Sequence, residues 1–276
     1  MISAVVFSKN RAAQLHLALY SIRKNFPDIS DITVLYTHTT DEFKEGYEIA
    51  QLFFPSSERV NWVEESNFEN DTIDILNKGC DHVCFFTDDD IVYRKVYDSC
   101  ESICQIFDEY SDLFTVSLRL GKNVYIQNVW RHLHCELPQE TAMFNRKYVL
   151  WNWRTLLSPD GYYSYPFSVD GHIYRTKEVL NIISKYDFDT PNALEGRAVY
   201  DYRDDMQDIM ACFVTSCLVN TPINIVGSSE NMSGVVHGAT LEELNKRYLN
   251  GEVPDLESMD FSDIKSSHQE VEIKFK

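Results

Sequence analysis

Apolar and polar positions along the first ninety residues predict strands and helices in alternation. Short apolar runs, each of the length of a buried strand, lie at residues 3–7, 31–37, 59–65 and 82–87. Between them apolar residues recur every three or four positions, which predicts helices over 11–24 and 41–53 and a third one that ends at Asn77. Strands that alternate with helices form a mostly parallel sheet with helices on both faces. We therefore expect an α/β fold, with ligands bound beyond the carboxyl ends of the strands.

The pattern is less regular after residue 95. It predicts helices over 96–109, 176–186 and 202–219 and a strand over 113–118. Trp, Tyr and His crowd between residues 130 and 165, where they could pack in the core or form flat platforms for sugar rings. The segment 251–276 carries more acidic than basic residues and few aliphatic ones. We expect one domain over 1–250, followed by an acidic tail at the periphery.

Composition narrows the possible partners. The chain has 276 residues, of which 44% are apolar, and a formal net charge of −18 at pH 7. The apolar fraction excludes a disordered chain, and the negative charge argues against nucleic acid and anionic membranes as partners. No apolar run reaches the roughly 20 residues of a membrane-spanning helix, and the first residues lack the basic leader of a signal peptide. We expect a cytoplasmic protein whose contact with membranes is at most peripheral or through a partner.

The seven cysteines include no CxxC pair. Cys100 and Cys104 lie four residues apart in a predicted helix, so they could bind a metal only with ligands from elsewhere. Free thiols in a reducing cytoplasm are the better interpretation.

The most informative stretch is a run of three aspartates, Asp88, Asp89 and Asp90, directly after the apolar run at 82–87. Their charges repel one another at the end of a buried strand, so the cluster is costly unless a cation neutralises it or water screens it. Oxygen ligands with open positions suit Mn²⁺ or Mg²⁺ that also holds a substrate phosphate. The alternative is a solvated acidic turn that caps the next helix.

Asp88-x-Asp90-x-Val92 also fits the motif of haloacid dehalogenase phosphatases. That family carries the motif on its first strand, with a Lys and a second acidic pair downstream, whereas here the motif follows about the fourth strand. A phosphatase or nucleotidyltransferase with a metal at Asp88 and Asp90 is therefore the alternative enzyme class.

Three motifs in order resemble the GT-A fold glycosyltransferases, especially the broad family 2 group. Phe7-Ser8-Lys9-Asn10-Arg11 stands where those enzymes have a strand-end turn that contacts the nucleotide. Asn77-Lys78-Gly79 resembles their Asn-x-Gly helix end, and Asp88-Asp89-Asp90 matches their DxD position. The resemblance implies a Rossmann-like, mostly parallel sheet, with a nucleotide-binding half over 1–95 and an elaborated acceptor-side half over 96–250. The donor contacts that it implies are Phe7, Ser8, Lys9, Arg11, Lys78, Asp88 and Asp89.

The second half of the chain has counterparts as well. Ser168 to Arg175 resembles the acceptor-side Gly-x-x-x-Arg segment of the family, and the stretch from Tyr186 to Glu195 resembles the one that holds the catalytic carboxylate. Glu195 is followed by Gly rather than by the Asp of the family, so Glu195 and Asp170 are both candidates for the catalytic base. Val235-Val236-His237-Gly238 resembles the strand end whose His binds the metal in some members. The metal ligands implied are Asp90 and His237.

The resemblance implies an enzyme that moves a sugar from a nucleotide-diphosphate sugar to a hydroxyl of a glycan or another acceptor. Mn²⁺ or Mg²⁺ would stabilise the leaving diphosphate as a Lewis acid, and a carboxylate base at Glu195 implies inversion at the anomeric carbon. Many bacterial members extend surface glycans, so we expect a role in polysaccharide synthesis. A module that binds nucleotide sugars without catalysis is the remaining alternative.

Overall fold

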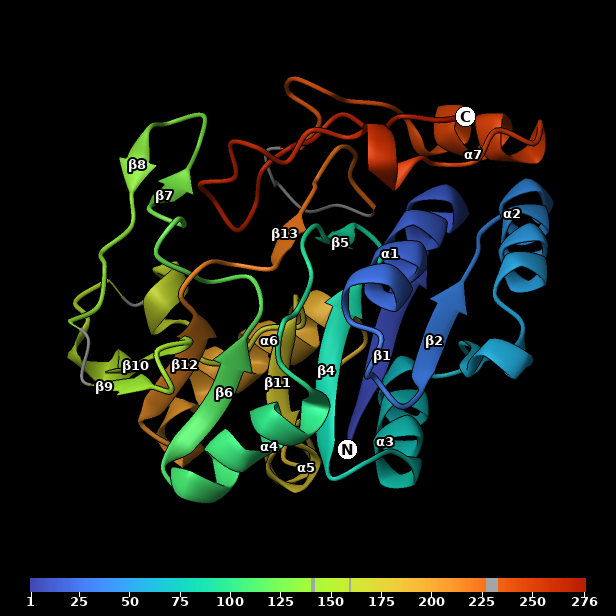
Figure 1. The fold of residues 1–276 in the computed structure, drawn as a ribbon. Coiled ribbons are helices and arrows are strands. Elements are labelled where there is room, and N and C mark those ends of the chain that lie inside the picture. The colour runs from blue at the N-terminus through green and yellow to red at the C-terminus, as the bar shows by residue number, and fades with distance from the viewer. Residues whose placement is uncertain (140–141, 159, 227–232) are drawn as a thin grey trace.

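The computed structural model describes residues 1–276 with the exception of 140–141, 159 and 227–232. Its main feature is a nine-stranded sheet in the order β3-β2-β1-β4-β11-β6-β12-β10-β9 (Figure 1). Both halves of the chain contribute strands to this sheet. The α/β class expected from the sequence is confirmed.

The first half of the chain forms the parallel side of the sheet. Its elements are β1 (Ile2–Lys9), α1 (Ala12–Asn25), β2 (Ile32–Thr37), α2 (Asp41–Phe53), β3 (Val60–Glu64), α3 (Phe68–Lys78) and β4 (His82–Thr87). β1 lies between β2 and β4 and is parallel to both, with Phe7 opposite Leu35 on one side and Thr87 on the other. The carboxyl ends of these strands therefore meet at one edge, which is the upper edge in Figure 1.

The second half completes the sheet with mixed pairing. Its elements are β5 (Asp90–Val92), α4 (Cys100–Glu109), β6 (Leu113–Ser117), β7 (Ile126–Asn128), β8 (Leu133–His134), β9 (Ala142–Phe144), β10 (Tyr148–Asn152), β11 (His172–Arg175), α5 (Thr176–Ile183), α6 (Pro191–Asp201), β12 (Ile209–Phe213), β13 (Leu218–Asn220) and α7 (Leu241–Leu249). β11 is antiparallel to both β4 and β6 and joins the two halves. β13 pairs with β5, and β7 with β8, outside the main sheet.

Helices cover both faces of the sheet because successive residues of a strand point to opposite sides. Ile2, Ala4 and Val6 of β1 pack in a core that includes side chains of α1, α2, α4 and α7. Val5 and Phe7 of the same strand pack in a second core with side chains of α3, α5 and α6. Several of these helices begin at a residue whose side chain accepts a backbone N–H of the first turn, as Thr40, Asn67 and Thr190 do.

The helix predicted over 202–219 is wrong, because this part of the chain contains β12 and β13. A continuous apolar run is compatible with a buried helix and with a strand that is buried on both faces. β12 lies between β6 and β10, where the sheet supplies partners on both sides for its backbone N–H and C=O groups.

The segment 251–276 does not lie at the periphery, so that expectation is corrected as well. Four of its apolar side chains are buried: Leu256, Met259, Ile264 and Val271. They pack against Leu17 of α1 and Ile91 of β5, and the backbone of Asn220 bonds to Ser267 and Gln269. The segment therefore crosses above the carboxyl ends of the parallel strands (Figure 1).

Two further expectations concern membranes and thiols. None of the described helices is long and apolar enough to cross a bilayer. The thiols of Cys100 and Cys104 are free, as the sequence predicts.

Candidate active site

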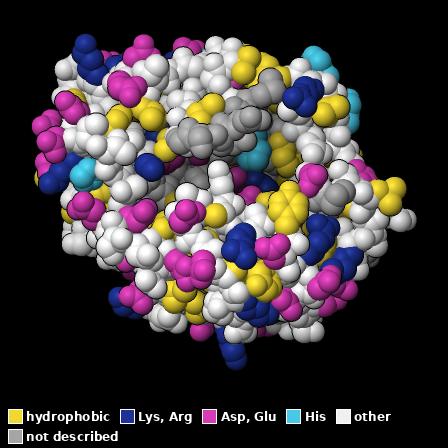
Figure 2. Space-filling model, turned by 180° about the vertical axis from the view of Figure 1, so that it is seen from behind, with side chains coloured by type: hydrophobic (Ala, Val, Ile, Leu, Met, Phe, Trp, Pro, Cys, Tyr) yellow, Lys and Arg dark blue, Asp and Glu magenta, His cyan; other side chains and the backbone are white. Residues whose placement is uncertain are grey.

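The candidate site lies where β1 and β4 end side by side. The parallel register that pairs Phe7 with Thr87 places the turn after β1 next to the three aspartates. The backbone N–H of Lys9 donates to Asp88 Oδ2 over 3.1 Å and joins the two turns. Figure 2, which views the molecule from behind, shows a hollow near the centre of that face, with acidic and basic side chains spread around it.

Arg11 is the cation that the chain itself supplies to this cluster. Its Nη1 lies 2.9 Å from Asp88 Oδ1 and 2.9 Å from Asp89 Oδ2. Its Nε and Nη2 donate to the side-chain and backbone oxygens of Asn224, over 2.8 and 2.7 Å. Burial alone would lower the pKa of the guanidinium, but the charges of Asp89 and Asp88 raise it above its ordinary value. Arg11 is therefore always charged, and it links the acidic turn, which consists of Asp88, Asp89 and Asp90, to the loop after β13.

The buried aspartates lie in different environments. Burial raises the pKa of Asp88 to about 6, and the charge of Arg11 limits the rise. Asp90 is completely buried and accepts hydrogen bonds from the Thr87 backbone N–H over 2.9 Å and from Asn220 Nδ2 over 3.1 Å. Burial, and then the charges of Asp170 and Asp89, raise the pKa of Asp90 well above its usual range.

Asp170 joins the acidic turn from the other side of the site. It precedes Gly171, whose backbone N–H donates to Phe85 of β4 and so fixes the approach to β11. The hydroxyl of Thr87 lies 2.8 Å from Asp89 Oδ1 and 3.1 Å from Asp170 Oδ1 and links the two carboxylates. The other oxygen of Asp170 accepts from Arg119 over 3.0 Å. Although burial works in the opposite direction, a hydrogen bond from His268 and the charge of Arg119 lower the pKa of Asp170 to about 2.

Glu195, in the first turns of α6, holds the segment that carries Asp170. Its Oε2 accepts from the Ser168 hydroxyl over 2.9 Å and from the Val169 backbone N–H over 2.7 Å. Burial and the nearby charge of Asp170 raise the pKa of Glu195, and burial together with Glu195 raises the pKa of the Tyr165 hydroxyl. The structure therefore brings the two sequence-predicted bases, Glu195 and Asp170, into one electrostatic group.

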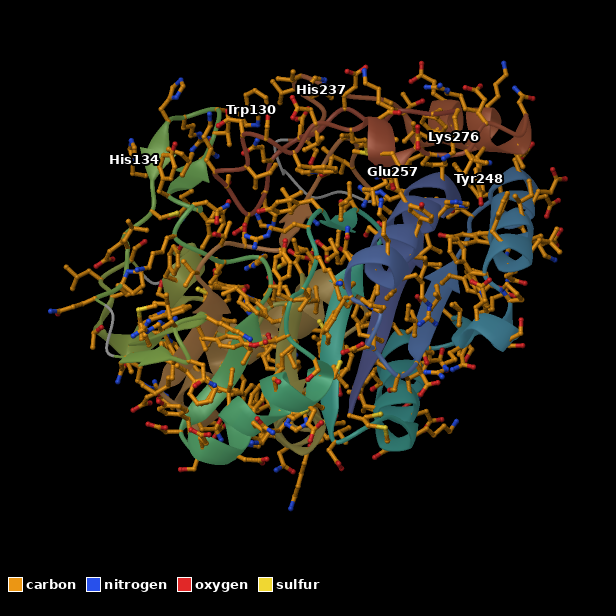
Figure 3. The ribbon with its side chains drawn as sticks, viewed as in Figure 1. Trp130, His134, His237, Tyr248, Glu257 and Lys276 are labelled. Atoms are coloured by element: carbon orange, nitrogen blue, oxygen red, sulfur yellow. The ribbon has the colours of Figure 1, made fainter. Side chains whose placement is uncertain are left out.

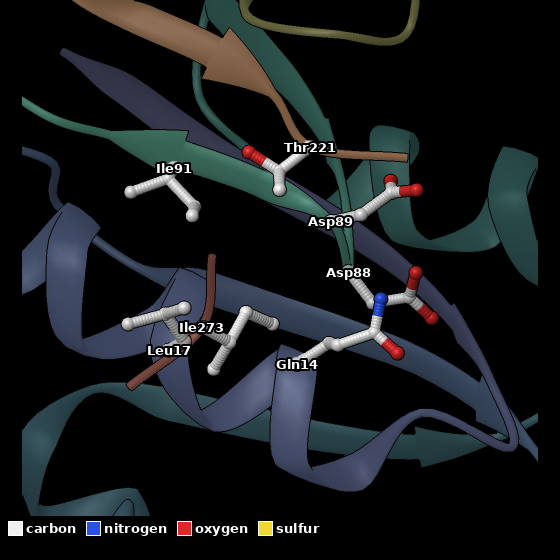
Figure 4. Close-up of a pocket in the computed structure, with 7 residues that line it drawn as sticks. All are labelled: Gln14, Leu17, Asp88, Asp89, Ile91, Thr221 and Ile273. Atoms are coloured by element: carbon white, nitrogen blue, oxygen red, sulfur yellow. The ribbon is translucent and has the colours of Figure 1, made fainter. Parts of the chain in front are cut away.

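A narrow pocket adjoins the acidic turn (Figure 4). Leu17, Ile91 and Ile273 form its apolar side, and Gln14, Asp88, Asp89 and Thr221 form its polar side. Within the described residues, Gln14 Nε2 and Thr221 Oγ1 are buried without a hydrogen-bond partner. Because Ile273 belongs to the C-terminal segment, that segment closes one wall of the pocket.

Not every sequence-predicted donor contact reaches the site. Phe7 is buried and packs on Phe68 and Phe85, with ring centroids 5.0 and 5.8 Å apart, so its side chain belongs to the core. Ser8 bonds to the Tyr47 hydroxyl over 2.7 Å. Lys78 ends α3 and precedes β4, so it lies at the opposite edge of the sheet from the aspartates. The structure therefore does not bring Lys78 to the aspartates, because α3 returns the chain to the amino ends of the strands.

His237 is the second metal ligand that the resemblance implies. The backbone N–H of His237 donates to Glu270 over 2.7 Å, and Figure 3 shows His237 at the upper edge of the molecule, beside the C-terminal segment.

Four further residues contact the acidic group and were not predicted from the sequence: Thr87, Arg119, Asn220 and His268. Arg119 and Asn220 carry no motif, but the strict alternation of charged and apolar residues over 270–276 is typical of a half-buried strand and could have marked the C-terminal segment.

The three aspartates bond to other groups of the chain itself. Every carboxylate oxygen of Asp88, Asp89 and Asp90 already accepts a hydrogen bond or ion pair from the chain. Across the part of the chain that the structure describes, no group of three or more His, Cys, Asp or Glu side chains could hold a metal ion. To bind an ion, the aspartates would have to give up contacts with Arg11, Thr87 and Asn220.

Comparisons with known proteins add a relative and a set of similar folds. No protein-family model matches the chain. The chain is 26% identical over 197 aligned residues to the bifunctional glycosyltransferase pgtA of Dictyostelium discoideum. The match covers 66% of this chain and 25% of that protein. The chain thus spans about a quarter of the length of this curated relative.

Among solved structures, the chain is similar to residues 1–349 of S. aureus TarS in complex with UDP, with 15% identity, a TM-score of 0.48 and coverage of 79% of this chain and 60% of that one. It is also similar to the galactosyltransferase LgtC in complex with donor and acceptor sugar analogues, with 15% identity, a TM-score of 0.36 and coverage of 74% and 66%. Because both TM-scores are low, these similarities support no conclusion about the activity.

Proposed function

We propose that this chain is a glycosyltransferase that moves a sugar from a nucleotide-diphosphate sugar to an acceptor hydroxyl. The observation that carries the proposal is the meeting of the acidic turn after β4 with Asp170 at the hydroxyl of Thr87. Donor-side and acceptor-side carboxylates thus share one site at the carboxyl edge of the sheet, where α/β folds bind ligands. The similarity to pgtA over 66% of the chain supports this class of reaction.

The residues divide between the two substrates. On the donor side, Asp88 accepts hydrogen bonds from the ribose hydroxyls, the exposed Lys9 side chain reaches the diphosphate, and Arg11 keeps the acidic turn in place. On the acceptor side, Asp170 and Glu195 are the carboxylates that the sequence offers for the proton of the attacking hydroxyl, and they belong to one electrostatic group. Attack from the face opposite the leaving diphosphate inverts the anomeric carbon. The acceptor in this proposal is a glycan hydroxyl, as in the synthesis of bacterial surface polysaccharides.

A panel of nucleotides and nucleotide sugars tests the proposal. Uridine, guanosine, adenosine and cytidine diphosphates and their sugar derivatives are added in turn, and the melting temperature is recorded. One nucleotide should raise it, because a ligand that binds only the folded state stabilises it by RT ln(1 + [L]/Kd). The matching nucleotide sugar should then give transfer to a glycan hydroxyl. Binding without hydrolysis or transfer would identify a module, and release of phosphate from a phosphate monoester would identify a phosphatase.

Mn²⁺ or Mg²⁺ at Asp90 stays a prediction, with His237 as its second proposed ligand. Calorimetric titration of Mn²⁺ into the nucleotide-bound protein, with Asp90→Asn as the variant, tests it. We expect saturable binding that the variant loses. The variant should fold at least as stably as the wild type, because it removes a buried carboxylate beside Asp89 and Asp170. Full turnover in excess chelator would contradict the metal.

A further inference from the structure

The C-terminal segment places a histidine against Asp170. His268 Nε2 lies 3.1 Å from Asp170 Oδ2, and its Nδ1 lies 3.4 Å from the Tyr162 hydroxyl. The Tyr162 ring meets the imidazole edge-on at 5.5 Å. Backbone bonds of Asn220 to Ser267 and Gln269 hold the residues on either side. The ring is therefore fixed in position, yet 40% of its side chain is exposed.

The two carboxylates at this place already accept hydrogen bonds from other groups of the chain. Asp170 Oδ1 accepts from Thr87, and Oδ2 faces both Arg119 and His268, while only 12% of its side chain is exposed. Glu195 uses Oε2 to hold Ser168 and Val169. A general base must have an accessible lone pair within hydrogen-bond reach of the attacking hydroxyl. Of these three side chains, His268 is the most exposed.

We propose that His268 is the general base of the transfer and that Asp170 orients it, an inference that rests on the proposed glycosyltransferase function. The carboxylate of Asp170 accepts the Nε2–H of His268, which leaves the lone pair on Nδ1. The acceptor oxygen forms its bond to the anomeric carbon while its proton passes to Nδ1. The bond between that carbon and the diphosphate oxygen breaks, and the electron pair leaves with the nucleoside diphosphate. Asp170 stabilises the imidazolium until water takes the proton.

The groups that face His268 come from three separate elements. Arg119, after β6, lies 3.4 Å from Nε2 and balances the charge of Asp170. Tyr162 donates its hydroxyl proton to Gln127 O over 2.6 Å, so its oxygen can only accept from Nδ1, which it does once that nitrogen is protonated. Asp170 itself precedes β11. The surroundings therefore suit a proton that arrives at Nδ1 during turnover.

Kinetics of His268→Gln test the proposal. Glutamine keeps a polar side chain but accepts no proton, so kcat should fall by a factor of about 10² to 10⁴. The KM for the donor and the affinity for the nucleotide should not change. Asp170→Asn should show a similar loss. The double variant should lose little more than either single variant, because the two residues act as one unit.

Two variants serve as controls. His134 is exposed on β8 and stacks on Tyr125, and no contact joins it to Asp170 among the described residues, so His134→Gln should match the wild type. Glu195→Gln keeps an oxygen that accepts from Ser168 and Val169, so its turnover should fall less than tenfold. A loss of 10² or more in Glu195→Gln would make Glu195 the base and overturn the proposal. Independent, additive losses in His268→Gln and Asp170→Asn would overturn it as well.

The remaining outcomes separate this proposal from the proposed function. If the wild type transfers sugar and His268→Gln keeps its turnover, or loses nucleotide binding instead, the roles proposed for His268 and Asp170 are wrong and the proposed function is supported. If the wild type transfers sugar from no donor of the panel, the proposed function is wrong, and so are the roles of His268 and Asp170. Nitrogen-15 spectra of the imidazole add a test without turnover. The neutral ring should carry its proton on Nε2, and a ring protonated on Nδ1 would overturn the proposal.

Discussion

His16 is a buried titratable residue outside the active site, and it makes the stability of the protein depend on pH. Its side chain lies between Phe53 and Phe54, and Nδ1 bonds to the Tyr248 hydroxyl over 2.8 Å. Burial, with a smaller contribution from Lys276, lowers the pKa of His16 to about 4. In the unfolded chain a histidine takes up its proton near pH 6.5. Between these values the unfolded state binds more protons, so stability is lost as the pH falls from 6.5 toward 4.

We expect His16→Gln to remove this dependence. Relative to pH 7, the low pKa of His16 should lower the free energy of unfolding by about 3 kcal/mol at pH 4, because a difference of one pKa unit corresponds to about 1.4 kcal/mol. Urea unfolding of both proteins at several pH values between 4 and 7 measures it. The raised pKa of Asp88, about 6, acts in the opposite direction in this range, because its folded form binds the extra proton. Since Asp88 is present in both proteins, the difference between them isolates His16, and equal slopes would contradict the assignment.

At the scale of single elements, the link between Asp170 and β11 depends on a glycine. Gly171 has φ +67°, and a Cβ there would lie 2.7 Å from Leu218 Cδ1 of β13. Left-handed backbone and this contact both penalise a side chain. We expect Gly171→Ala to lower the free energy of unfolding by about 1–3 kcal/mol and to reduce turnover, because Asp170 is the preceding residue.

Gly196 is the matched control for this glycine. It lies inside α6, and a Cβ there would meet nothing within 4 Å. Alanine in a helix interior is favoured over glycine, so Gly196→Ala should raise the free energy of unfolding by about 0.5–1 kcal/mol. Chemical denaturation of both variants checks the pair. If the two substitutions had the same effect, the close approach of Gly171 to β13 would carry no energetic weight.

The accuracy of the sequence predictions also varies from element to element. Strands β1, β2 and β4 follow from short apolar runs because each is buried and its signal lies in its own residues. β12 was mistaken for helix, since its neighbours β6 and β10 and not its sequence decide its conformation. The motifs predict Arg11, Asp88 and Asp89 as contacts of one donor, and in the structure Arg11 pairs with both aspartates. Arg119 and His268 could not be predicted, because their partner Asp170 lies 51 and 98 residues away and no local pattern records such contacts.

At the scale of the whole molecule, the C-terminal segment is part of the core. It covers Leu17 and Ile91, which deletion of residues 251–276 would expose to water. We expect the chain truncated after Asn250 to lose cooperative unfolding or to melt well below the full chain. If the truncated chain had an unchanged melting temperature and denaturant dependence, the segment would not be part of the core.

A single substitution tests the same packing more gently. Ile264 is 8% exposed and packs in the cluster formed by this segment. Ile264→Ala should lower the free energy of unfolding by about 2–4 kcal/mol, through lost burial and the cavity that remains. Leu52, which is 82% exposed on α2, is the control, and Leu52→Ala should change stability by less than about 0.5 kcal/mol. Equal effects of the two substitutions would contradict the packing.

The clamp that Arg11 forms on Asn224 spans 213 residues of sequence, and the contact of His268 with Asp170 spans 98. Closing such long loops costs chain entropy that local helices do not pay, so contacts of this kind form late in folding. We therefore expect the active site to form after the local helices. During refolding from urea, the helical circular dichroism should return before nucleotide binding does. Binding of the nucleotide is then a stricter measure of the native state than any spectrum of its secondary structure.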